Sequence, residues 1–346
     1  MSEKMRAVVF VGPRQAEIRN LDIPEPKEGE VLIRVRACNI CTTEQGQYLG
    51  TRPNKYPIIG GHEFGGDIVK INSKEETNLK VGDRVSLGYV YCGTCDYCKQ
   101  GLYTLCPELY KDDVRYGEYR GFFAFADYLT APINTVYKFT SDLPYKKIGF
   151  EEPLGTVVHG QKKLNIKAGQ YVVVFGAGTM GLLNAIYAKT QGAIVISVDL
   201  NNDKLARAKK AGINYVINSK EVDAKAEIMK ITGNLGADVA IIAVGATPVN
   251  NQAVDIVRNQ GKVLFFAAGY PKPEITVDPN ELHYSEKQLI GTYGGDPEDF
   301  IMSNRLLDSG NVDVSPLLDE EYDCEDFKEA LEKSVDGNHY RITMNF

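Results

Sequence analysis

The sequence contains no tryptophan, only four histidines and no long apolar run among its 346 residues. A membrane helix needs roughly 18 to 20 consecutive apolar residues, and no stretch approaches that length. The amino terminus, MSEKMRAVVF, also lacks the extended apolar region of a secretion signal. We therefore expect a cytoplasmic protein with no membrane partner. Two of the histidines, His283 and His339, stand in no motif and are expected to be surface or packing residues.

A block of basic residues is absent as well. Lys and Arg are spread along the chain, and the formal net charge is -7. A protein that neutralises phosphates along a nucleic acid needs clustered positive charge. Nucleic acid is therefore not an expected partner.

The sequence does contain enough apolar material for two domains, because 43% of its 346 residues are hydrophobic and one core rarely serves a chain of this length. The residues before about 150 are rich in predicted strands. Short alternating runs, EVLIRVRA at 30–37 and DRVSL at 83–87, are separated by Gly, Pro and Asn turns. This pattern predicts a barrel-like or irregular β domain.

After about residue 170, apolar strands alternate with helical stretches rich in Ala and Lys. The strand candidates are YVVVF (171–175), IVISVD (194–199), YVI (215–217), DVAIIAV (238–244) and KVLFFAA (262–268). Continuous apolar strands between helices are typical of an α/β, doubly wound parallel sheet covered on both faces. The final segment does not continue this alternation of strands and helices, because helices are predicted at 297–309 and 325–334 and a strand at 341–345. We expect it to return to the first domain.

A glycine-rich motif joins strand YVVVF to a predicted helix, and it comprises Gly176, Gly178, Thr179, Met180 and Gly181. The first glycine permits a tight turn, the second lets the backbone approach a pyrophosphate, and the third allows close helix packing. Asp199 ends the next strand, where a carboxylate can accept hydrogen bonds from ribose hydroxyls. The alternative is an ordinary turn, with Asp199 capping the following helix.

The choice between NAD and NADP depends on the charges that follow this motif. The carboxylate of Asp199 would repel a 2′-phosphate, and no arginine comes directly after it, so we predict NAD. Lys204, a candidate cofactor contact, and Arg207 follow on the next predicted helix and leave NADP open.

Four of the seven cysteines, Cys92, Cys95, Cys98 and Cys106, lie on one loop. Four thiolates suit a closed tetrahedral zinc site that stabilises a loop with little core of its own. An iron-sulfur cluster is the competing interpretation, because Pro107 follows the last cysteine, although the final gap is too long for that motif. Unligated thiols are the third. We predict structural zinc.

A third group of candidates is dispersed along the chain. It consists of Cys41 with Thr42 and Thr43, then His62 and Glu63 in GHEFGG, then Glu152 in EEPLGTVVHG. Each has an ordinary structural alternative, such as a buried thiol, a turn residue, a surface charge or a carboxylate at a helix amino terminus.

The motifs ACNICTTE, GHEFGG, CGTCDYC, FADY, EEPLGTVVH, VFGAGTMG and SVDL, in this order and spacing, resemble the zinc-containing medium-chain dehydrogenase/reductase family over essentially the whole chain. The resemblance implies a GroES-like catalytic domain at 1–152, a Rossmann domain at 153–289 and a return to the catalytic domain at 290–346. It also implies a homodimer or homotetramer.

The resemblance further implies that Cys41 and His62 bind a catalytic zinc, with Glu63 and Glu152 as exchanging or alternative ligands. Thr43 falls where the family carries the hydroxyl that passes the substrate proton outward. Glu44 replaces the more usual Asp, and Gly46 stands where many members carry a relay histidine. Cys38 is not a ligand in the family pattern and is expected to be a packed thiol.

The reaction implied is hydride transfer between a secondary alcohol, or its ketone, and NAD. Zinc with an open coordination position lowers the pKa of an alcohol oxygen. Glu152, where classical alcohol dehydrogenases have Cys, resembles the polyol, sorbitol and threonine dehydrogenase branches, so we predict a polyol, a sugar alcohol or its phosphate. Alternatives are an NADP-dependent ketone or aldehyde reductase and a noncatalytic nucleotide-binding relative. Tyr48, Arg52 and Lys55 are candidate substrate contacts or members of a solvated loop.

Overall fold

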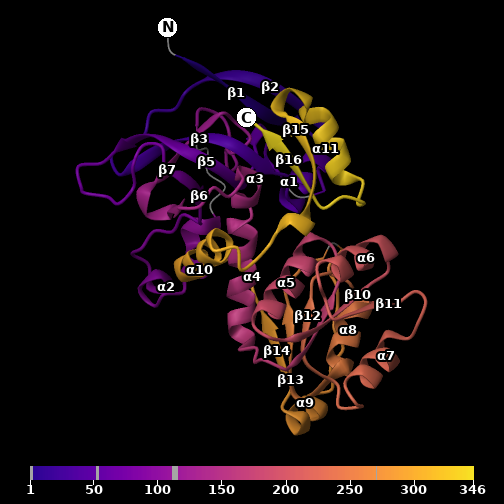
Figure 1. Cartoon of the computed structure of the whole chain (residues 1–346). Coiled ribbons are helices and arrows are strands. Elements are labelled where there is room, and N and C mark those ends of the chain that lie inside the picture. The colour runs from indigo at the N-terminus through magenta and orange to yellow at the C-terminus, as the bar shows by residue number, and fades with distance from the viewer. Residues whose placement is uncertain (1–2, 52–53, 111–115, 270) are drawn as a thin grey trace. The chain divides into compact units, whose positions relative to one another are not determined.

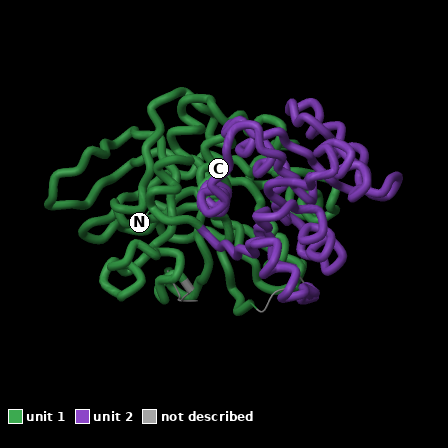
Figure 2. Tube along the Cα trace, turned by 90° about the horizontal axis from the view of Figure 1, so that it is seen from below, with its two compact units in different colours: residues 1–155, 295–346 green, residues 156–294 purple. Residues whose placement is uncertain are grey.

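The computed structural model describes residues 3–51, 54–110, 116–269 and 271–346. The chain forms two compact units (Figure 2). Unit 1 comprises Met1–Gly155 and Gly295–Phe346, and unit 2 comprises Thr156–Gly294. The boundaries expected from the sequence, after residues 152 and 289, lie slightly earlier in the chain. No helix in the described ranges is long and apolar enough to cross a membrane.

Unit 1 is built around two sheets. The smaller has the order β2-β1-β4, with strands β1 (Lys4–Gly12), β2 (Gln15–Asp22) and β4 (Ile58–Ile59). The larger has the order β15-β16-β3-β5-β6-β8, with β7 also paired to β3. Its strands are β3 (Glu30–Asn39), β5 (Glu63–Asn72), β6 (Arg84–Leu87), β7 (Tyr128–Pro132), β8 (Val136–Phe139), β15 (Leu318–Asp323) and β16 (Arg341–Asn345).

An apolar cluster in unit 1 contains residues of both of its chain segments. β16 pairs antiparallel with β3, with Thr343 opposite Asn39. Helix α11 (Phe327–Val335) packs on β16, and its buried Phe327 and Leu331 join the same apolar cluster as Val31 of β3. The final strand therefore lies inside the sheet that carries the candidate site (Figure 1).

Unit 2 is a six-stranded parallel sheet of order β11-β10-β9-β12-β13-β14. Its strands are β9 (Tyr171–Phe175), β10 (Ile194–Asp199), β11 (Tyr215–Asn218), β12 (Ala237–Ile242), β13 (Val257–Phe265) and β14 (Gln288–Gly291). Its helices are α5 (Thr179–Thr190), α6 (Asn202–Lys210), α7 (Ala224–Ile231), α8 (Thr247–Ile256) and α9 (Pro279–Ser285). The strand order reverses at β9, which is where α/β sheets bind dinucleotides.

Besides α11, the described helices of unit 1 are α1 (Thr42–Leu49), α2 (Asp96–Lys99), α3 (Tyr145–Ile148) and α10 (Pro297–Asp308). Helix α4 (Glu151–Leu164) begins in unit 1 and continues into unit 2. Helix α1 follows β3 directly, because Cys41 adopts the extended N-cap conformation and Gly50 closes the helix with a left-handed backbone.

Candidate functional site

Three of the predicted zinc ligands meet where β3 and β5 pair. Asn39, at the end of β3, lies opposite Glu63, at the start of β5. This register places Cys41, which caps α1, beside His62 and Glu63, so that their ligand atoms all lie within 4.8 Å of one another. Residues that are far apart in the sequence are thus brought together by one strand pair.

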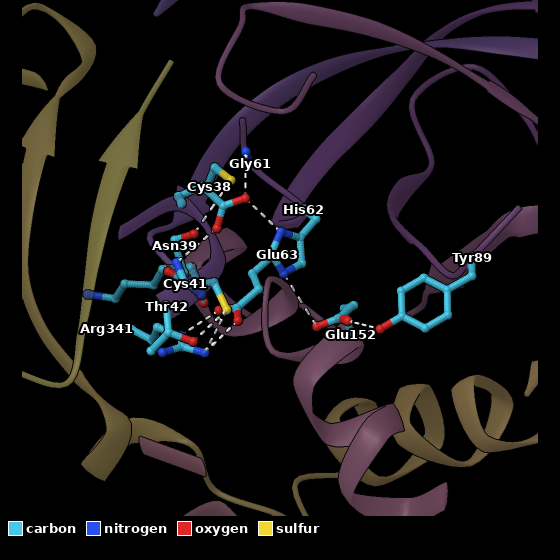
Figure 3. A network of polar contacts seen from close by, with 12 residues as sticks. Cys38, Asn39, Cys41, Thr42, Gly61, His62, Glu63, Tyr89, Glu152 and Arg341 are labelled. Carbon is cyan, nitrogen blue, oxygen red and sulfur yellow. Dashed lines mark hydrogen bonds and ion pairs between the residues drawn. The ribbon is translucent and has the colours of Figure 1, made fainter. Parts of the chain in front are cut away.

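Glu152 joins this group from the first turn of α4. Its Oε2 lies 4.0 Å from Nε2 of His62, and its Oε1 accepts a hydrogen bond from the hydroxyl of Tyr89. Figure 3 shows Glu152 between His62 and Tyr89. The sequence contains two adjacent glutamates, and the structure directs Glu152 toward the histidine. The carboxylate oxygens of Glu151 have no hydrogen-bond partner among the described residues.

Glu44 is a site residue whose contact the sequence did not reveal. Its buried carboxylate lies 2.8 Å from Nδ1 of His62 and accepts hydrogen bonds from the backbone N–H groups of Gly61, at 3.1 Å, and Cys41, at 3.3 Å. A carboxylate at Nδ1 fixes the imidazole orientation and leaves Nε2 for a metal. The available signal was the capping box, with Glu44 three residues after Cys41.

Arg341 is a second residue that sequence reasoning missed. Its guanidinium forms two hydrogen bonds of 2.6 Å to the two carboxylate oxygens of Glu63, and its Nη2 lies 3.5 Å from Sγ of Cys41. The side chains of this ion pair are only 3% and 1% exposed. The guanidinium of Arg341 thus places a buried cation between the carboxylate of Glu63 and the sulfur of Cys41.

Burial and neighbouring charges set the protonation of these groups. Burial would lower the pKa of His62, but Glu44 and Cys41 raise it well above its usual value. Burial would raise the pKa of Glu44, but His62 lowers it. For Glu152 burial prevails and raises the pKa, although His62 opposes the change. Burial also raises the pKa of Cys38, which agrees with a packed thiol rather than a ligand.

The donor set fits a catalytic zinc ion. A thiol, an imidazole and a carboxylate from Cys41, His62 and Glu152 are the ligand types that zinc takes in catalytic sites. Glu63 belongs to the group whose ligand atoms lie within 4.8 Å of one another, but Arg341 binds both of its carboxylate oxygens. Of the two candidate carboxylates, Glu152 is the one without a bidentate arginine partner. The assignment of Glu63 or Glu152 as the carboxylate ligand of zinc stays a prediction.

The remaining unit 1 candidates lie on or near α1. Thr43 is partly exposed in its first turn, two residues from Cys41. Tyr48 is buried in α1, and its hydroxyl donates to Glu332 at 2.7 Å, so its position fits neither the substrate contact nor the solvated loop that the sequence left open. Tyr48 lies on the buried face of α1 and packs in the core of unit 1. Lys55 is exposed, and Arg52 lies outside the described residues.

A pocket in unit 1 opens beside the metal candidates. His62, Glu152 and Tyr89 form one part of its wall, and the ring of Phe122 lies 5.0 Å from the His62 ring. The other lining residues are mainly apolar and include Leu87, Val90, Leu109, Leu129 and Ala131, together with the polar Glu108, Thr130 and Thr135. Such a wall suits a small organic substrate with a few polar groups.

The four cysteines of the loop lie together as predicted, with all four sulfur atoms within 4.8 Å of one another. Cys92 Sγ lies 3.9 Å from Cys98 Sγ and accepts from the backbone N–H groups of Thr94 and Cys95. Hydrogen bonding, chiefly from Thr94, lowers the pKa of Cys92 to about 6, whereas burial raises that of Cys98 to about 12. This set of four sulfurs fits a closed metal site. Zinc as the ion stays a prediction.

The glycine motif in unit 2 has the geometry of a dinucleotide loop. Gly176 has φ +94°, and a Cβ on Gly181 would lie 1.8 Å from the Gly176 oxygen, so both positions require glycine. A Cβ on Gly178 would meet nothing within 4 Å, which leaves its N-cap backbone open to a ligand. Thr179 and Met180 follow, partly exposed, in the first turn of α5.

Asp199 is bound to the backbone around this loop. Its carboxylate accepts from the N–H groups of Ala177 at 2.6 Å, Leu200 at 2.7 Å and Asn201 at 2.9 Å. It therefore ties the glycine loop to the end of β10. Asn201, not Asp199, caps α6, so the capping alternative is wrong. Lys204 is partly buried in the first turn of α6.

The two histidines without a motif have local contacts of their own. The ring of His283 packs against Tyr284 at 4.9 Å, and His339 lies within 4.0 Å of three carboxylates, including Asp319 and Asp336. Both contacts agree with the packing and surface roles predicted for these residues.

Comparisons with known proteins agree with this arrangement. The alcohol dehydrogenase GroES-like domain family matches residues 27–142, and the zinc-binding dehydrogenase family matches residues 179–309. A sorbitol dehydrogenase of Halalkalibacterium halodurans is 32% identical over 93% of each chain. An L-threonine 3-dehydrogenase of Pyrococcus furiosus is 34% identical over 99% of each chain. The crystal structure of benzyl alcohol dehydrogenase from Acinetobacter calcoaceticus has a TM-score of 0.90 at 29% identity and covers 99% of both chains. The predicted fold, a GroES-like domain with a Rossmann domain, is confirmed.

Proposed function

The chain belongs to the zinc-containing medium-chain dehydrogenase/reductase family, and from that premise we propose that it transfers a hydride between a polyol-type secondary alcohol and NAD. The observation that carries this proposal is the position of Glu152. Its carboxylate lies beside His62 and the pocket in unit 1, where it adds an oxygen ligand to the thiol and imidazole of the candidate zinc site.

The zinc ion, when bound, supplies a Lewis acid that lowers the pKa of the substrate hydroxyl. Cys41, His62 and Glu152 would hold it, with Glu63 as the alternative carboxylate. Glu44 keeps the imidazole of His62 in the required orientation. The hydroxyl of Thr43 would accept the proton from the substrate oxygen and pass it outward. A bound NAD would supply the nicotinamide that takes up the hydrogen of the alcohol carbon as a hydride, and the glycine motif and Asp199 would hold this cofactor.

The polyol assignment is supported by the polar part of the pocket wall. Glu108 and Thr130 offer carboxylate and hydroxyl groups that suit a substrate with several hydroxyls. The names of two relatives give such substrates: the sorbitol dehydrogenase and a D-arabitol-phosphate dehydrogenase of Enterococcus avium. The latter is 29% identical over 99% of this chain. A phosphorylated polyol therefore belongs to the same proposal.

NAD is favoured over NADP by the charge at the end of β10. Asp199 places a carboxylate where the ribose hydroxyls bind in this fold, and it would repel a 2′-phosphate.

We also propose a homodimer or homotetramer in the cytoplasm, with no membrane or nucleic-acid partner. The competing functions are an NADP-dependent ketone or aldehyde reductase and a noncatalytic nucleotide-binding protein.

The deciding experiment measures reduction of NAD and of NADP by the purified protein. The substrates are pentitols, hexitols, their phosphates, threonine and simple secondary alcohols. Each assay is repeated after chelation of the catalytic metal and again after zinc is restored. Activity with one polyol and NAD, lost on chelation and recovered with zinc, is the expected result. Activity that survives verified removal of the catalytic metal would refute the roles of Cys41, His62 and Glu152.

A further inference from the structure

Tyr89 and Arg341 contact the two candidate carboxylates from opposite sides of the site (Figure 3). Arg341 binds both oxygens of Glu63, whereas Tyr89 donates to Oε1 of Glu152. The second oxygen of Glu152 lies 4.0 Å from Nε2 of His62. The tyrosine therefore holds one oxygen of this carboxylate and leaves the other facing the ligand atom of the histidine.

The ring of Tyr89 is itself fixed by Phe300 of α10. The two rings meet edge to face, with centroids 5.1 Å apart and an interplanar angle of 84°. Phe300 is 1% exposed and lies against Gly88 and Gly155, where an added Cβ would approach its ring to 2.9 and 2.7 Å. The backbone at both glycines therefore lies close against the phenyl ring, and a side chain at either position would collide with it.

The same helix also holds the turn that carries Glu152. Ser303, three residues after Phe300, donates from Oγ to the backbone oxygen of Glu151 at 2.7 Å. Because α10 contacts both the ring of Tyr89 and the first turn of α4, it fixes the donor and the acceptor of the hydrogen bond together.

We propose that Tyr89 is a positioning residue for the catalytic metal, which it serves by orienting the carboxylate of Glu152 toward His62. The inference rests on the proposed zinc site but not on the identity of the substrate. Partners that orient metal ligands typically contribute about 10- to 100-fold to metal affinity. A tyrosine that only packed in the pocket wall would need its ring and not its hydroxyl.

The test removes that hydroxyl alone, in Tyr89→Phe. The catalytic site of the purified full-length chain is loaded with Co²⁺, and two quantities are measured: the visible absorption of the bound cobalt and its rate of release to a chelator. We expect an altered cobalt spectrum and release about 10-fold faster or more, with the metal of the four-cysteine loop retained.

Tyr137→Phe is the matched control. Its ring also packs on Phe300, with centroids 5.7 Å apart, but its hydroxyl lies 3.4 Å from the backbone oxygen of Pro297 instead of contacting Glu152. This variant should release cobalt at the wild-type rate. Glu152→Gln provides a second comparison, because adding Tyr89→Phe to it should have little further effect if the hydroxyl acts through that carboxylate.

A wild-type spectrum and release rate in Tyr89→Phe would overturn the proposal, as would equal effects of Tyr89→Phe and Tyr137→Phe. A change confined to the KM for an alcohol, with cobalt binding unchanged, would overturn it too and would make Tyr89 a substrate contact. The proposed function can fail separately. If no alcohol is oxidised, cobalt release still decides the role of Tyr89.

Discussion

The glycine loop of unit 2 and the candidate zinc site of unit 1 are assembled in different ways. The loop and Asp199 lie within one continuous segment that forms β9, α5 and β10, and their contacts are local. The zinc site draws side chains from the start of α1, β5, α4 and β16, which span most of the chain. A local motif largely carries its own geometry, whereas a dispersed site depends on the fold. Four predictions test this contrast.

The largest effect is expected from Cys41→Ser in the dispersed site. Replacing the thiol by a weaker zinc ligand should remove the catalytic metal and reduce alcohol oxidation below detection. Elemental analysis should then give one zinc per chain instead of two, with NAD binding to unit 2 unchanged. Retention of two zinc ions and activity would show that Cys41 is not a ligand.

Arg341→Met should cost the most stability. It leaves the buried carboxylate of Glu63 without its cation, and breaking a buried pair in this way costs about 3–5 kcal/mol. Denaturant unfolding measures the loss. The double variant Glu63→Gln with Arg341→Met should recover most of it, because the unpaired charge is gone. If the double variant is no more stable than Arg341→Met, the damage comes from packing instead.

Two glycine variants separate folding from binding in the local motif. Gly181→Ala places a Cβ on the Gly176 oxygen and should lower the free energy of unfolding by about 1–3 kcal/mol. Gly178→Ala adds a methyl group to open space, so unfolding should be unchanged while NAD binding weakens. Calorimetry and NAD titration of both proteins measure the difference. Equal stability losses would contradict this assignment.

The smallest effect concerns Glu151. Burial, followed by the charge of Glu152, raises the pKa of Glu151 well above its usual value, so the folded protein retains a proton that the unfolded chain releases. This contribution is fully present below the unfolded pKa and is lost as pH rises toward the folded pKa, by up to about 1.4 kcal/mol per pH unit. Glu151→Gln should therefore flatten the fall in stability between about pH 5 and 8. Urea unfolding at both ends of that range checks it, and an unchanged slope would exclude Glu151 as its source.

The sequence was sufficient to predict an element or a motif where the side-chain pattern and the backbone geometry require the same residues. The strand predicted at 171–175 is β9 to the residue, and the glycine positions follow from backbone geometry that only glycine tolerates. The strand predicted at 262–268 was placed too late, because β13 spans Val257–Phe265 and begins in a polar stretch. Periodicity locates a buried strand better than it locates the ends of that strand.

The dispersed site shows what the sequence could not supply. Glu44 was noted only as a departure from aspartate, and neither Arg341 nor Tyr89 belongs to a motif. Their roles come from pairings between distant segments, which no local pattern specifies. The same limit explains Tyr48, whose place in a loop-like stretch suggested a substrate contact although the helix turns it inward toward Glu332.

The position of β16 in the central sheet of unit 1 has a consequence for biosynthesis. The ribosome makes β3 and β5 early, but the strand that pairs with β3 and supplies Arg341 is made only after all of unit 2. Domains generally fold as units during synthesis, amino-terminal ones first. While unit 2 is translated, unit 1 lacks the strand that pairs at this edge of its sheet, and Glu63 lacks the cation of Arg341. Unit 2 can therefore complete its fold before unit 1 does.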